Sequence, residues 1–133
     1  MKVKAALLLS GVGLLMWSGP ILAHHSFASE YDADKPIELK GIVTKIEWTN
    51  PHARFYVDVT DANGDVTNWN LELASPNVLA RQGWRRTSLQ IGDRVTVNGS
   101  MAKDGSKMAN ARSVVLPDGR RIFSNAASTG AGQ

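Results

Sequence analysis

Hydrophobic and polar residues alternate with a period of two along most of the chain from residue 37 onward. This alternation is typical of half-buried β-strands. Turn sequences rich in Gly, Pro, Asn and Asp separate the alternating stretches, and Asn63-Gly64 is a strong hairpin signal. The strands that the pattern predicts cover residues 37–49, 53–60, 66–73, 94–101, 108–116 and, as a short extra strand, 121–123.

The first predicted strand is long and bent. Its hydrophobic residues begin in the phase of Ile37 and Leu39 and continue in the opposite phase from Ile42 to Trp48. A change of phase within one strand indicates a β-bulge or a strong bend. We expect it at Gly41, because a residue without a side chain tolerates close approach of another backbone.

One segment between the third and fourth strands has the signals of a short helix over residues 76–82. Ser75 is a good N-cap, Pro76 suits the first helical position, and Gly83 can end the helix. Trp84 is expected to pack just beyond its end.

The element order β-β-β-α-β-β predicts an all-β fold with one short helix. A long bent first strand and a helix between strands three and four match the OB-fold, a five-stranded, partly open Greek-key barrel. The alternative is an open β-sandwich with one helix.

The N-terminus has the layout of a secretory signal peptide. Lys2 and Lys4 precede an uncharged run over residues 5–17, and the small residue Ala23 suits the position before a cleavage site. That run is shorter than the roughly 20 residues that a membrane-spanning helix needs. We therefore expect cleavage after Ala23, export to the periplasm or beyond the cell, and no membrane attachment of the mature protein.

The signal peptide (residues 1–23) is followed by three predicted parts. They are a polar N-terminal arm (24–35), one OB-like barrel domain (36–123) and a disordered tail rich in Ser, Ala and Gly (124–133).

Composition limits the chemistry of this domain. The chain has no Cys, which excludes thiol catalysis, iron–sulfur clusters and Cys-ligated zinc. The whole chain carries 15 Lys and Arg against 12 Asp and Glu, but part of that excess lies in the signal peptide. The mature domain is nearly neutral, so we expect it not to bind nucleic acid.

The three histidines, His24, His25 and His52, suggest a metal site. Cleavage after Ala23 makes His24 the first residue, so that its amine and imidazole can chelate one ion, with His25 or His52 as a further donor. Tetragonal nitrogen sites suit Cu(II), and this arrangement resembles the histidine brace of secreted copper proteins. The alternative is an exposed terminus without a specific role and a His52 that only shapes the turn after Asn50-Pro51.

Other polar and aromatic side chains have candidate roles beside structural ones. Oxygen donors or hydrogen-bond acceptors for the imidazoles are expected among Glu30, Asp32 and Asp34. A stacking patch for a ligand would use Trp48, Arg54, Tyr56 and Trp69, although the alternation puts Trp69 in the core. Met101 and Met108 offer sulfur for Cu(I), but core packing is the favoured interpretation. The basic cluster Arg81, Arg85 and Arg86 is expected to be a solvated surface.

The chain resembles a family of small secreted bacterial proteins of unknown function. The resemblance lies in the signal peptide, the start His24-His25-Ser26-Phe27 and the segment Trp48-Thr49-Asn50-Pro51-His52. It implies that the arm and the first turn share one site or one fold contact.

The sequence thus predicts an exported binding protein that is not an enzyme and that holds copper through His24, His25 and His52. The alternative is a metal-free periplasmic module that binds a partner protein or small ligand on the face of the second and third strands. An oxidative copper enzyme that uses the same histidines is a third possibility.

Overall fold

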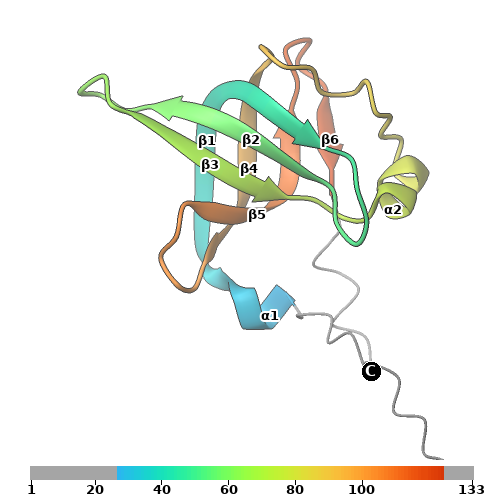
Figure 1. The fold of residues 1–133 in the computed structure, drawn as a ribbon, viewed down its shortest axis with the longest axis horizontal. Helices are drawn as coiled ribbons and strands as arrows, with labels where there is room; N and C mark the ends of the chain where they lie inside the picture. Colours follow the sequence, from blue (N-terminus) through green and yellow to red (C-terminus); the bar gives the residue numbers. More distant parts are fainter. Residues whose placement is uncertain (1–26, 125–133) are drawn as a thin grey trace, which may run out of the picture.

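Six β-strands and two short helices make up residues 27–124, which is the part of the chain that the computed structural model describes (Figure 1). In chain order they are α1 (Phe27–Glu30), β1 (Tyr31–Glu47), β2 (Arg54–Thr60), β3 (Val66–Glu72), α2 (Pro76–Arg81), β4 (Arg94–Ala102), β5 (Met108–Val115) and β6 (Arg121–Phe123). The predicted signal peptide, His24, His25 and residues 125–133 of the predicted tail lie outside the described residues.

The strands form one sheet in the order β3-β2-β1-β4-β5-β6, and a further pairing between β3 and β5 closes the first five into a barrel. The β3–β5 contact is parallel, whereas the remaining pairs are antiparallel. A closed five-stranded barrel with a helix between β3 and β4 is the OB-fold. The predicted fold class is therefore confirmed, including the short sixth strand.

Strand β1 pairs with β4 along its first part and with β2 along its second. The change of partner falls at Gly41 and Ile42. A Cβ atom on Gly41 would stand 2.5 Å from the backbone oxygen of Asp58, so the bend requires glycine here. The register shift itself lies between Val43 and Lys45, a little later than the bulge predicted at Gly41.

The first strand also starts earlier than its hydrophobic pattern predicts. It begins at Tyr31 rather than at residue 37, because Tyr31 pairs with Ala102 of β4 before a register shift that ends at Pro36. Residues 32–35, three of which are charged, lie between these two pairs, so the hydrophobic alternation does not reveal this part of the strand. Part of the predicted arm is thus strand, fixed against the barrel.

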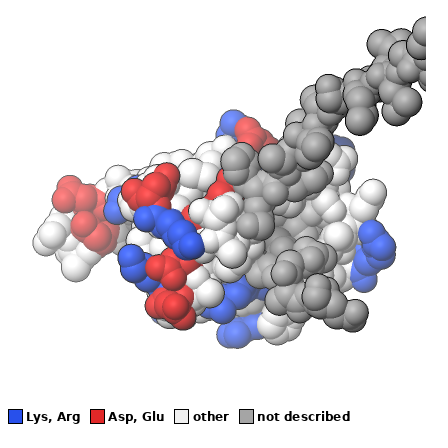
Figure 2. All heavy atoms as spheres, turned by 90° about the horizontal axis from the view of Figure 1, so that it is seen from below, with Lys and Arg blue, Asp and Glu red and all other residues white. Residues whose placement is uncertain are grey.

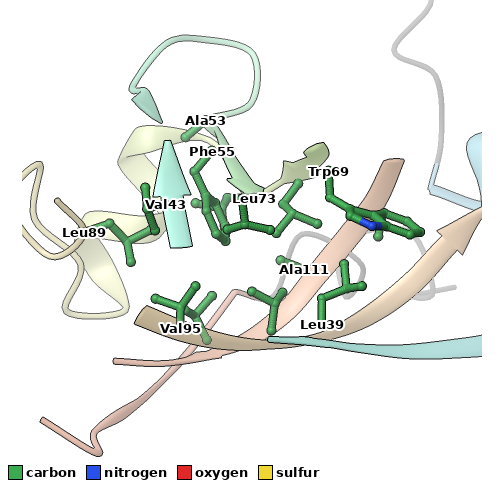
Figure 3. Packing of buried hydrophobic residues seen from close by; sticks show 14 of the residues in the cluster. Leu39, Val43, Ala53, Phe55, Trp69, Leu73, Leu89, Val95 and Ala111 are labelled. Carbon is green, nitrogen blue, oxygen red and sulfur yellow. The ribbon is translucent and has the colours of Figure 1, made fainter. Parts of the chain in front are cut away.

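The inner faces of the strands meet in one hydrophobic core (Figure 3). Phe55 and Leu71 are fully buried at its centre, and Trp69 belongs to it, as the alternation predicts. Leu79 of α2 and Trp84 beyond it are also buried. The Ser75 hydroxyl accepts a hydrogen bond from the Val78 amide, which confirms the predicted N-cap.

Candidate functional site

The carboxylate of Glu72, the last residue of β3, is the centre of a polar cluster on the outside of the barrel. Glu72 is only 4% exposed. A buried carboxylate is costly unless charged and hydrogen-bonding partners surround it. The residues that do so here, together with Glu72, we call the Glu72 cluster: Tyr31, His52, Arg54, Asn70 and Glu72.

The two oxygens of Glu72 have different partners. Oε2 accepts a hydrogen bond from the Tyr31 hydroxyl at 3.0 Å and one from Arg54 Nη2 at 2.6 Å. Oε1 faces the imidazole Nδ1 of His52 at 3.2 Å. One carboxylate therefore joins the start of β1 to the loop between β1 and β2.

The hairpin register brings Arg54 and Glu72 together, because these residues are direct cross-strand partners in the β2–β3 pair. Arg54 also donates through Nη1 to Asn70 Oδ1 at 3.2 Å, so the guanidinium is held by two side chains of β3. A planar guanidinium with two fixed contacts is a stable anchor for a carboxylate. The orientation of Glu72 is therefore set by β2 and β3 themselves.

The loop that carries His52 is fixed to the end of β3 by its backbone. The Ala53 amide donates to the Ala74 carbonyl at 3.0 Å, and the Leu73 amide donates to the Ala53 carbonyl at 2.9 Å. Ala53 itself is fully buried. These two bonds hold the residue next to His52, so the imidazole is presented from a rigid position.

The Tyr31 hydroxyl is a hydrogen-bond donor under ordinary conditions. Burial and, after it, the negative charge of Glu72 raise the pKa of Tyr31 well above its usual value. The proton stays on the phenol and is directed at Glu72, at 3.0 Å. Tyr31 therefore acts as a fixed link between β1 and the carboxylate.

The His52 ring is partly open to solvent, with 37% of its side chain exposed, while the Glu72 side chain is buried. Its Nδ1 faces the carboxylate, which leaves Nε2 as the second ring nitrogen. A carboxylate that accepts from one imidazole nitrogen is the usual outer partner of a metal-binding histidine. Of the predicted metal ligands, His52 alone lies among residues 27–124.

The N-terminal arm reaches the same region of the barrel. The Lys103 amide donates to the Glu30 carbonyl at 2.9 Å, and Lys103 Nζ donates to the Ala28 carbonyl at 2.5 Å. The rings of Phe27 and Tyr31 stack at 5.7 Å between centroids. The described part of the arm is thus held beside the Glu72 cluster as far back as Phe27.

The predicted metal site is only partly within the described residues. His24 and His25 lie outside them, and residues 27–124 contain no group of three His, Asp or Glu side chains that could hold a metal ion. Asp32 pairs with Lys35 and accepts from the Asp34 amide, so it is not one of the partners of His52. The acceptor of the imidazole is Glu72 instead of an acidic residue of the arm.

The alternation in residues 66–73 puts Glu72 on the face opposite Trp69, but nothing in the sequence pattern gives Glu72 a role. A usable signal exists: counting outward from the Asp61–Asp65 turn pairs Arg54 with Glu72 across the hairpin. The contact of Tyr31 with Glu72 has no such signal, because these residues are 41 positions apart in the chain.

The predicted stacking patch is smaller than expected. Trp69 is buried in the core and Trp48 packs against the core, which leaves Arg54 and Tyr56 on the face of β2 and β3. Tyr56 donates to Glu47 at 3.2 Å and lies under Lys45 Nζ, 5.0 Å from the ring centroid. The Lys45 ammonium, 2.5 Å from Glu47, lowers the pKa of that carboxyl.

Cations on this face are matched by acids. Lys45 pairs with Glu47 and Arg54 with Glu72, and Figure 2 shows basic and acidic side chains side by side on the face in view. A nucleic-acid surface is expected to gather unpaired cations on one face. Arg81, Arg85 and Arg86 are exposed, in agreement with a solvated surface.

The β2–β3 hairpin extends beyond the barrel (Figure 1). A groove is lined by residues of β1, β2, β3 and β4, among them Asp58 and Thr60 near the end of β2. The first β1–β2 pair is Ile42 with Asp58, so the end of β2 pairs only with β3. Ile42 and Val66 line this groove and are 38% and 60% exposed, and Lys40 and Arg94 lie beside them. The groove is a second candidate surface, separate from the Glu72 cluster.

The architecture defines the protein as a small OB-type barrel with a buried carboxylate cluster at the foot of its N-terminal arm. The chain belongs to a family described as a family of unknown function (DUF6152), whose model matches residues 12–111. No curated protein matches the chain.

Among solved structures, the chain is similar to the mitochondrial single-stranded DNA-binding protein Rim1 of S. cerevisiae. The two share 13% identity over 62% of this chain and 94% of the yeast chain, with a TM-score of 0.49. Within residues 27–124, neither helix is long and apolar enough to cross a membrane.

Proposed function

We propose that the protein is exported, loses residues 1–23, and holds copper through the new N-terminus. The amine and imidazole of His24 would chelate Cu(II), and His25 and His52 would supply further nitrogen donors. Nitrogen donors in this number suit Cu(II) better than other first-row divalent ions. The role would be that of a periplasmic or extracellular binding protein that holds or delivers the metal, without enzymatic activity.

The observation that carries this proposal is that Tyr31 and His52 bond to the same carboxylate, Glu72. Tyr31, at the end of the arm, is thus connected to His52 through Glu72. Phe27 stacks on Tyr31, and His24 is three residues earlier. At about 3.3 Å per residue, these three residues could carry His24 up to about 10 Å from Phe27.

The test begins with the mature terminus, located by mass spectrometry of protein recovered after export. Cu(II) titration of that mature form would follow, with His24→Ala and His52→Ala as variants. A third form carries four Gly and Ser residues in front of His24, which keeps every imidazole but moves the amine away.

We expect all three altered forms to bind Cu(II) at least about 100-fold more weakly, since loss of a ligand should exceed the 10–100-fold cost of losing an outer partner. Thermal denaturation of the metal-free forms checks that each is folded. If all three bind copper as tightly as the unaltered mature protein, the copper proposal is wrong.

The groove supports a second candidate function, a metal-free periplasmic interaction module. Its exposed Ile42 and Val66 beside Lys40 and Arg94 favour a partner protein or small ligand with an apolar and anionic character. A photo-crosslinking residue placed at Val66 should then give an adduct in the periplasm that the same residue at exposed Thr87 does not give. Equal labelling at both positions would contradict this function.

A further inference from the structure

We propose that Glu72 is the positioning residue of the copper site, and that it orients both the His52 imidazole and the arm that carries His24. This inference rests on the proposed function. One carboxylate oxygen would fix the imidazole of His52, and the other, through Tyr31, would fix the base of the arm that carries His24.

The first half concerns which nitrogen of His52 binds the metal. Oε1 of Glu72 lies 3.2 Å from Nδ1 and, as an ionised carboxylate oxygen, can only accept a hydrogen bond. The proton of a neutral ring therefore belongs on Nδ1, and the lone pair is on Nε2. Glu72 thus selects Nε2 as the nitrogen that receives copper, and it also holds the plane of the ring.

The second half concerns the arm. Oε2 of Glu72 accepts from the Tyr31 hydroxyl, and Phe27 stacks against the Tyr31 ring. Side chains that touch one another therefore connect the carboxylate to Phe27. A shift of Glu72 would therefore disturb its contacts with Tyr31 and with the His52 ring at the same time.

Glu72 can do this because it is itself held firmly. Arg54 Nη2 contacts Oε2 at 2.6 Å, and Arg54 is fixed in turn by Asn70. The carboxylate is buried, which strengthens its charged hydrogen bonds relative to those at an open surface. A metal site whose ligands come from two separate segments needs such a shared support, because small errors in ligand placement weaken binding.

Glu72→Gln is the informative substitution, since an amide offers one acceptor oxygen where the carboxylate offers two. Tyr31 and Arg54 are both donors and would take the amide oxygen, so that the amide NH₂ would face His52 Nδ1. The ring proton would then move to Nε2, the nitrogen required by the metal. The control is Glu47→Gln, which also removes a carboxylate bonded to a tyrosine and a cation but lies outside the Glu72 cluster.

We expect mature Glu72→Gln to bind Cu(II) about 10–100-fold more weakly than the unaltered protein, whereas Glu47→Gln should bind normally. The EPR spectrum of the copper-loaded Glu72→Gln form should show a changed nitrogen hyperfine pattern, an effect that a purely structural role would not produce in the folded fraction.

The two proposals fail in different ways. If His24→Ala and His52→Ala leave copper binding unchanged, the proposed function itself is wrong. If those variants weaken binding but Glu72→Gln matches Glu47→Gln in affinity and spectrum, the positioning role alone is wrong.

A measurement on the unaltered, metal-free protein decides the matter should Glu72→Gln not fold. The ¹⁵N NMR signals of the neutral His52 ring should identify Nδ1 as protonated and Nε2 as bare. A proton found on Nε2 instead would overturn the positioning role.

Discussion

Gly41 and Asp58 approach each other so closely that a methyl group on Gly41 would stand 2.5 Å from the Asp58 carbonyl oxygen. The oxygen belongs to the backbone of β2, so it cannot rotate away as a flexible side chain would. This contact lies at the point where β1 changes its partner from β4 to β2.

Gly41→Ala should therefore destabilise the barrel by about 1–3 kcal/mol, the usual cost of forcing an extra carbon into a packed position. Urea denaturation followed by circular dichroism measures the free energy of unfolding. Lys40→Ala, an exposed change one residue earlier in β1, is the control and should stay within about 0.5 kcal/mol of the unaltered protein. Equal stability of the two variants would show that β1 bends without requiring glycine.

Removal of Arg54 should cost far more than removal of a surface arginine. Arg54→Ala leaves the buried carboxylate of Glu72 without its positive partner, and breaking such a pair typically costs about 3–5 kcal/mol. Arg120 makes an equally short contact with Asp118, but its side chain is 69% exposed, so Arg120→Ala should cost at most about 1 kcal/mol. Thermal and urea unfolding compare the two, and similar losses would mean that burial of Glu72 is not what makes the Arg54 pair important.

Alkaline pH should selectively weaken the contact between Tyr31 and Glu72. The pKa of Tyr31 is raised in the folded protein, first by burial and then by Glu72, so folding favours the protonated phenol. The stabilisation that this preference adds to the folded protein is fully present below the pKa of tyrosine in the unfolded chain, about 10. It decreases as the pH rises above that value, because the unfolded chain then releases a proton that the folded chain retains.

Melting temperatures measured from pH 8 to pH 11.5 test this expectation. The unaltered protein and Tyr56→Phe should both lose stability above pH 10, whereas Tyr31→Phe should start from a lower value and lose less over that range. If the melting temperatures of Tyr31→Phe and Tyr56→Phe fell in parallel with rising pH, this would argue against a buried, protonated Tyr31.

The parts of the fold that were predictable from sequence are those with local signals. Alternation located the strands, Ser75-Pro76 located α2, and the one long bent strand indicated the barrel. The start of β1 was not predictable in this way, because Tyr31 pairs with β4 across a register shift and so interrupts the period of two.

The candidate site was predictable in part for the same reason. His52 stands out in the sequence as one of three histidines, but its partner Glu72 looks like an ordinary polar residue on an outer face. Glu72 also accepts a hydrogen bond from Tyr31, which is 41 residues away in the chain. Contacts of this range follow from the closed barrel and have no signature in local composition.

The parallel contact between β3 and β5 limits when the barrel can close during synthesis. Residues 70–72 of β3 pair with residues 108–110 of β5, so the barrel cannot close before β5 has been made. A chain that is still leaving the ribosome therefore lacks the last pairing of the barrel until residues 108–110 have emerged. Because pairings between residues far apart in the chain form slowly, we expect closure of the barrel to be a late step in folding.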